Sequence, residues 1–256
     1  MSTTTASAPP TVTLRQYSPA TVLAIWALAA VPMGLAAWVV APALAGTTAV
    51  TPRFLTALLG ALTGGLCWQL LIVVGFVAHE QRSLRWSVVR RALWLGPPTN
   101  AAGRHGGRLW LWALPLIAGF GVVELTPLNL SAPAERDFGA VLSSESGQAL
   151  LRGNWGLFAL VVAMLILNTV LGEELLFRGL LLPRMRDAFG RADWVVNGVL
   201  FGVYHLHQPW SIPGSVARGL MAGYATRRLR SAWLGIIAHS AQSVVFLVLT
   251  LTVVAS

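Results

Sequence analysis

Long uninterrupted apolar runs dominate this chain of 256 residues and constrain what it can fold into. Short loops separate seven of them, at 20–43, 54–78, 109–126, 154–182, 195–207, 214–226 and 232–254. Most have the length of roughly 18 to 25 residues with which an α-helix spans the hydrocarbon core of a bilayer. We therefore expect an all-α, polytopic membrane bundle of about seven transmembrane helices, with the lipid bilayer as its main partner.

The composition excludes an ordinary soluble domain and a nucleic-acid-binding protein. Hydrophobic residues make up 55% of the chain and charged residues only 11%, whereas soluble domains carry about 25% charged residues. The net charge is +9, and all 18 basic residues are arginines that gather in short loops between the apolar runs. This placement is typical of membrane topology rather than of nucleic-acid binding. The single cysteine, Cys67, excludes an internal disulfide and a zinc-thiolate cluster.

The arginine-rich loops predict the orientation of the chain. Loops 79–108, 183–193 and 227–231 hold most of the arginines and fall on one side if each run spans once. Because positively charged loops stay inside, we expect a multi-pass protein of the cell membrane with a cytoplasmic N-terminus. The segment 82–96, "RSLRWSVVRRALWLG", is expected to lie as a basic amphipathic helix on the cytoplasmic face.

Three charges interrupt the apolar run "LNTVLGEELLFRGLLL" at 167–182, namely Glu173, Glu174 and Arg178. Each would cost roughly 2.5 to 3.5 kcal/mol at the centre of a span. Glu174 and Arg178 are four residues apart and can pair, whereas Glu173 points about 100° away around the helix. Glu173 is therefore either a functional carboxylate or part of a structural charge network between helices.

Two histidines in other runs favour a functional site. His205 and His239 come out at depths of about 16 and 12 Å from the arginine-rich side, and Glu173 at about 16 Å. A buried glutamate can act as general base on water, with one histidine sharing the proton transfer and the other donating to an oxyanion. Alternatively, the same three residues could bind zinc and leave one position for water. Either site predicts hydrolysis of a carbonyl, above all a peptide bond.

Three short motifs resemble those of the CPBP family, also called the Abi or CAAX-protease family. "EELLFR", "FGVYH" and "HSAQS" are similar to its patterns E-E-x-x-x-R, F-x-x-x-H and H-x-x-x-N or D, in the same order. The Ser/Thr/Ala/Pro-rich composition of the first residues predicts a disordered tail at 1–19, and the apolar runs predict N-terminal transmembrane helices and loops at 20–153. The resemblance implies a protease-like helical bundle at 154–254. It implies a glutamate-type CAAX endopeptidase that cleaves a peptide or protein substrate, including membrane-anchored ones, without a cofactor. Zinc is the alternative.

The resemblance also assigns roles to residues. Glu173 becomes the base that activates water with the help of His205, and His239 becomes the oxyanion donor. Supporting positions fall on Glu174, Arg178, Phe201 and Ser243. Ser243 departs from the Asn or Asp of the family pattern. This departure favours an alternative in which the chain is a catalytically weakened member that acts as a bacteriocin-immunity or scaffold membrane protein.

Three further polar residues have simpler interpretations. Arg218 lies within the run 214–226 and needs a partner, either Glu124 or a backbone carbonyl. Glu80 begins an arginine-rich loop and is expected to be solvated. His207 lies near Pro209 and is expected to be a loop or interface residue away from His205.

Overall fold

The computed structural model describes residues 14–48, 51–133, 136, 140 and 143–256, and within them the chain is helical without a β-strand. Residues 1–13, most of the predicted tail, lie outside the described part. The α-helices are α1 (Pro19–Leu35), α2 (Ala41–Ala45), α3 (Pro52–Gln81), α4 (Trp86–Ala92), α5 (Ala113–Leu125), α7 (Glu145–Leu151), α8 (Trp155–Ile166), α9 (Arg186–Phe189), α10 (Asp193–Val203), α11 (Ile212–Leu229) and α12 (Trp233–Val254). The predicted all-α membrane bundle is confirmed.

Five helical segments among the described residues are long and apolar enough to cross a bilayer, so the predicted number of about seven is not confirmed. They are Pro19–Ala45, Pro52–Gln81, Gly107–Leu125, Trp155–Arg184 and Trp233–Val254. The fifth and sixth predicted spans form α10 and α11 instead. The 11 residues of α10 rise by about 16 Å, or half of a hydrocarbon core about 30 Å thick. The longer α11 runs antiparallel to α10, with Gly198 against Leu220 and Gly202 against Val216, so the two helices form a hairpin.

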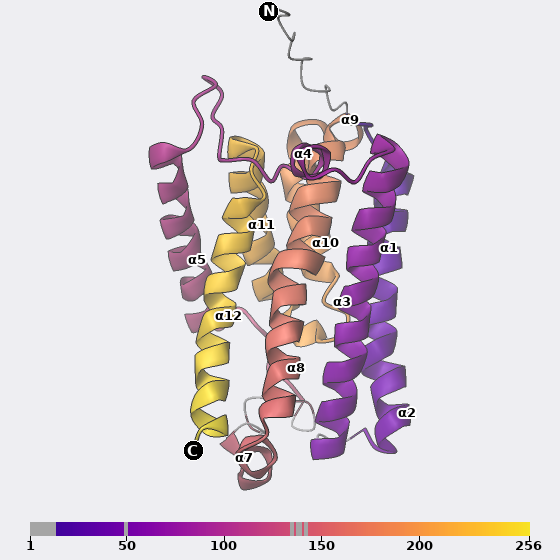
Figure 1. Cartoon of the computed structure of the whole chain (residues 1–256), viewed down its shortest axis with the longest axis vertical. Coiled ribbons are helices and arrows are strands. Elements are labelled where there is room, and N and C mark those ends of the chain that lie inside the picture. The colour runs from indigo at the N-terminus through magenta and orange to yellow at the C-terminus, as the bar shows by residue number, and fades with distance from the viewer. Residues whose placement is uncertain (1–13, 49–50, 134–135, 137–139, 141–142) are drawn as a thin grey trace, which may run out of the picture.

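The arginine-rich loops gather at one end of the bundle. Figure 1 shows α4 and α9 at one end of the bundle, and α7 and the C-terminus at the opposite end. We call the first of these the arginine-rich end. The expected surface helix in 82–96 is present as α4, which is shorter than the whole basic segment. Because the hairpin of α10 and α11 begins and ends at this end, the arginine-rich loops before and after it lie together, as the sequence predicts.

Glycines allow the two helices of the hairpin to pack with their backbones in contact. A Cβ on Gly198 would stand 2.7 Å from the backbone nitrogen of Leu220, and a Cβ on Gly202 would stand 2.6 Å from that of Val216. Small residues are the usual means by which membrane helices approach this closely. The close packing places His205, two residues after the end of α10, in the interior of the bundle.

The tip of the hairpin is held by elements from the first half of the chain. Trp26 on α1 donates to the carbonyl oxygen of Leu200 at 2.8 Å, and Trp38 donates to that of Leu206 at 2.7 Å. After α5, the side chain of Asn129 accepts a hydrogen bond from the backbone nitrogen of Gly214 at 3.0 Å. The N-terminal helices thus position the hairpin directly.

Glu80 is not solvated as expected, because it pairs with a buried arginine. Arg184 is fully buried at the end of its span and donates to Glu80 Oε2 from Nε at 2.9 Å and from Nη2 at 2.8 Å. The hydroxyl of Tyr17 also donates to Glu80. Burial raises the pKa of the Tyr17 hydroxyl, and this hydrogen bond raises it further. These hydrogen bonds connect Tyr17, just before α1, with α3 and the end of the central span.

Candidate active site

The acidic motif lies where the central span departs from α-helical geometry. The segments Leu167–Gly172 and Leu175–Leu181 are π-helical, and Glu173 and Glu174 stand between them. Local π-helical turns occur frequently at functional sites. The segment after the acids is also the centre of the main hydrophobic core, with Leu176 and Phe177 fully buried. The two carboxylates are therefore presented from a distorted helix inside the protein.

Glu174 is the structural member of the acid pair. Its Oε1 atom lies 3.3 Å from Arg178 Nη1 and 3.3 Å from His239 Nδ1, and the glutamate and arginine side chains are fully buried. On α12, Gly235 makes the approach possible, since a Cβ there would overlap the Glu174 carboxylate. Glu174 thus joins two of the three motifs through one oxygen atom.

Phe201 packs at the centre of the three motifs. The guanidinium carbon of Arg178 lies 3.9 Å from the centroid of the Phe201 ring, which is a cation–π contact. The same ring lies 5.1 Å from the ring of His205 and 6.2 Å from that of His239, both edge-on. Phe201 therefore contacts the buried cation and both imidazoles, which explains why an aromatic residue occupies this position.

Glu173 is buried beside its paired neighbour but keeps a free oxygen. Its side chain is 2% exposed, and its Oε2, like that of Glu174, has no hydrogen-bond partner among the described residues. Unlike Glu174, it forms no ion pair with any described residue. His239 and Arg178 act on its charge electrostatically. The hydroxyl of Tyr204 forms a hydrogen bond with the Glu173 carboxylate, and Gln69 on α3 donates to that hydroxyl. An unpartnered oxygen on a buried carboxylate is what a bound water would require.

Tyr204 and Gln69 were missed by the motif analysis. Both side chains are fully buried. Tyr204 lies inside the quoted "FGVYH" motif, at a position where the family pattern accepts any residue. Gln69 is an isolated amide within the apolar run 54–78, and a polar residue in a span is itself a signal for a buried contact. The first half of the chain therefore contributes a side chain to the site.

His205 lies directly after α10 and is oriented by the backbone. Its Nδ1 atom lies 3.0 Å from the carbonyl oxygen of Phe201. The tautomer with hydrogen on Nδ1 donates to this oxygen and leaves Nε2 as an acceptor. His207 is not away from His205 as expected, because the chain turns after α10 and their rings stack with centroids 5.3 Å apart.

Arg218 pairs with Glu124, one of the two partners expected from the sequence. Its Nη1 atom lies 3.2 Å from Glu124 Oε2 on α5, and Nη2 lies 3.2 Å from the hydroxyl of Ser215. Gln242 on α12 donates to the same Glu124 oxygen at 2.9 Å. Arg218 also acts electrostatically on Glu173 and His205. This second charge network borders the site and connects α5, α11 and α12.

Ser243 and the alternative zinc ligands are the remaining predicted site residues. Ser243 lies one turn after His239 on α12, and no hydrogen bond within the described part of the chain joins it to the other site residues. Among the described residues, no three His, Cys, Asp or Glu side chains lie together as metal ligands. His239 Nδ1 faces Glu174 and His205 Nδ1 faces a carbonyl, so Nε2 is the nitrogen that each ring keeps for a substrate, a water or the alternative zinc ion.

Comparison with known proteins identifies the motif-bearing region. The family described as Type II CAAX prenyl endopeptidase Rce1-like matches residues 154–245. These residues contain all three motifs, the hairpin and the first half of α12. No curated protein and no solved structure matches the chain. The resemblance to the CPBP or CAAX-protease family is therefore confirmed over residues 154–245.

Proposed function

We propose that this protein is an intramembrane endopeptidase in which Glu173 activates a water molecule for attack on a peptide bond. The observation that carries the proposal is the unequal environment of the two carboxylates. Oε2 of each carboxylate is buried without a hydrogen-bond partner, but only Glu174 contacts Arg178 and His239 through its other oxygen, whereas Glu173 forms no ion pair with any described residue. The family match to CAAX endopeptidases supports the reaction class, with a peptide or protein as substrate.

Glu173 and His205 supply the attacking water. A water bound to the free Glu173 oxygen transfers a proton to the carboxylate as its oxygen attacks the scissile carbonyl carbon. With its Nδ1 hydrogen donated to the Phe201 carbonyl, His205 offers Nε2 to accept a hydrogen bond from the same water. When the C–N bond breaks, the protonated Glu173 gives the proton to the leaving amine. The two products are a carboxylate and a free amine.

His239 stabilises the tetrahedral intermediate. Its Nδ1 faces the Glu174 carboxylate, which orients the ring in the way that an aspartate orients the histidine of a serine protease. The imidazolium form carries a second hydrogen on Nε2, and this atom donates to the developing oxyanion. Phe201 lies beside both imidazoles and shields the charge from competing solvent.

The site opens toward the cytoplasmic half of the membrane in this proposal. The hairpin that carries His205 enters from the arginine-rich end, and positively charged loops face the cytoplasm. The N-terminus then lies in the cytoplasm and the chain is a multi-pass protein of the cell membrane. A substrate reaches Glu173 as a membrane-associated peptide whose scissile bond enters the bundle from that side.

A weakened enzyme with an immunity or scaffold role is the second candidate. Ser243 favours it, because serine replaces an amide donor of the family pattern with a short hydroxyl. The two candidates differ in one outcome, which is whether the wild-type chain cleaves any peptide. A suitable assay uses the detergent-solubilised protein and a quenched fluorescent peptide with a C-terminal CAAX sequence, with and without a farnesyl group on the cysteine.

The first prediction concerns the base. Glu173→Gln keeps the shape of the side chain but cannot accept a proton, so turnover should fall by about 100-fold or more. His205→Ala should cause a loss of similar size. Glu145→Gln, at an exposed glutamate on α7, is the matched control and should keep wild-type turnover. Wild-type cleavage by a folded Glu173→Gln variant would refute the proposed chemistry.

The second prediction concerns the hydroxyl beside the base. Tyr204→Phe removes the hydrogen bond to Glu173 but keeps the ring contacts with Phe177 and His205. Hydrogen bonds to charged groups contribute about 1.5 to 3 kcal/mol, so kcat should fall by about 10- to 100-fold. The pH profile of kcat should also shift, since the carboxylate loses a donor. Tyr224→Phe on the outer face of α11 is the control, and equal effects of the two changes would exclude a positioning role for Tyr204.

The third prediction separates the glutamate mechanism from the zinc alternative. Prolonged dialysis of the detergent-solubilised protein against a strong chelator should leave cleavage intact if Glu173 and the histidines act alone. A loss of activity that added zinc restores, together with one zinc per chain by elemental analysis, would instead support the metal site.

A further inference from the structure

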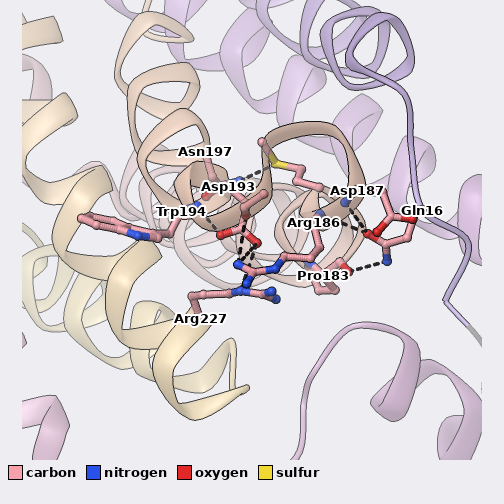
Figure 2. A network of polar contacts seen from close by, with 10 residues as sticks. Gln16, Pro183, Arg186, Asp187, Asp193, Trp194, Asn197 and Arg227 are labelled. Atoms are coloured by element: carbon pink, nitrogen blue, oxygen red, sulfur yellow. Dashed lines mark hydrogen bonds and ion pairs between the residues drawn. The ribbon is translucent and has the colours of Figure 1, made fainter.

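A basic cavity of about 400 Å³ lies at the arginine-rich end, between the start of the hairpin and its return. Its wall contains Arg186, Arg191, Arg227, Arg228 and Arg230. Figure 2 shows part of this wall, where Arg186 and Arg227 both reach toward Asp193 at the start of α10. The cavity lies apart from Glu173 and the histidines and has no part in the proposed hydrolysis.

The cavity carries an uncompensated positive charge. Asp193 is fully buried and pairs with Arg227 Nε at 3.0 Å and with Arg186 Nη1 at 3.7 Å. Arg186 and Arg230 both repel the Arg227 guanidinium. The exposed side chains of Arg191, Arg228 and Arg230 form no ion pair with any described residue. Five guanidinium groups against one carboxylate leave four positive charges around one cavity.

A second cavity of about 480 Å³ shares Arg230 with the first and is lined by Arg90 and Arg91. The Arg91 atoms Nε and Nη2 are buried and have no hydrogen-bond partner among the described residues. Buried donors are normally satisfied, because an unpaired buried group costs about 1 to 3 kcal/mol. The two cavities thus combine excess positive charge with donors that lack an acceptor, which indicates an anionic ligand.

The position of the cavities favours a lipid over a soluble anion. Arg186 lies two residues beyond the end of the candidate span Trp155–Arg184, and residues just beyond a span adjoin the lipid headgroups. Trp194 and Tyr224 line the first cavity with their ring centroids 5.3 Å apart, and Tyr224 is 45% exposed. Such aromatic pairs are typical of the bilayer interface. Val199 lies deeper on α10 and is 40% exposed, which leaves an apolar surface for an acyl chain.

We propose that these two arginine-lined cavities bind the phosphate-bearing headgroup of an anionic phospholipid from the adjoining leaflet. The phosphate accepts bidentate hydrogen bonds from guanidinium groups, for which arginine has the matching geometry. The acyl chains follow Trp194, Tyr224 and Val199 along the outer face of the hairpin. The bound lipid connects α9, α10 and the end of α11, and so fastens the hairpin that carries His205.

The test measures lipid binding by the full chain in a neutral detergent. The probe is phosphatidylglycerol with a fluorescent acyl chain, and phosphatidylcholine with the same label is the neutral comparison. The double variant Arg191→Gln/Arg228→Gln removes two exposed cavity arginines. It should weaken phosphatidylglycerol binding by about tenfold or more, since charged hydrogen bonds contribute about 1.5 to 3 kcal/mol. Arg85→Gln/Arg104→Gln removes two exposed arginines outside both cavities and should bind nearly as the wild type does.

The outcomes separate a built site from general attraction to negative charge. Equal weakening in the two double variants would overturn the proposal in favour of diffuse electrostatics. Equal binding of phosphatidylcholine would do the same. Displacement of the lipid by comparable concentrations of inorganic phosphate would assign the cavities to a soluble anion, and displacement by an acidic peptide would assign them to a protein. Thermal unfolding of each variant without lipid checks the fold, and single Arg228→Gln replaces the double variant if that fails to fold.

Discussion

The buried guanidinium of Arg178 is the interaction on which the rest of the site depends. The side chain is fully buried in the hydrophobic core, where an unpaired charge is strongly unfavourable. Its partners come from different elements, namely Glu174 on its own span and the face of Phe201 on α10. His239 on α12 joins through the same Glu174 oxygen. Satisfying one cation therefore requires three helical elements to meet, which brings the motif residues together.

Pairing Arg178 with one carboxylate leaves the second available. Glu173 is as deeply buried as its neighbour, yet its hydrogen bond comes from a tyrosine hydroxyl rather than from a cation. Gln69 positions this hydroxyl from α3, and Trp26 and Trp38 hold the hairpin from α1 and the helical turns after it. The family match covers residues 154–245 alone. The side chains that support the site therefore extend beyond the matched region into the N-terminal helices.

Patterns along the sequence predicted the membrane bundle, the arginine-rich end and the three motifs, because each depends on local composition or spacing. The predicted number of about seven spans is not confirmed, because α10 and α11 are less long or less apolar than the five candidate spans. The partners of Glu80 and Arg218 depend on contacts between distant segments. The π-helical turns beside Glu173 also left no pattern in the sequence. His207 stacks on His205 because the chain turns after α10, which an unbroken helix would not allow.

The central claim is that two adjacent glutamates have separate tasks, and a paired measurement on Glu173→Gln and Glu174→Gln tests it most directly. Unfolding of both variants in detergent and turnover on the same peptide would be measured side by side. The account predicts that Glu174→Gln lowers the free energy of unfolding by about 3 to 5 kcal/mol, because it leaves Arg178 buried without its carboxylate. Glu173→Gln should unfold as the wild type does and yet lose turnover. Equal stability of the two variants, or full turnover by a stable Glu173→Gln, would contradict the account.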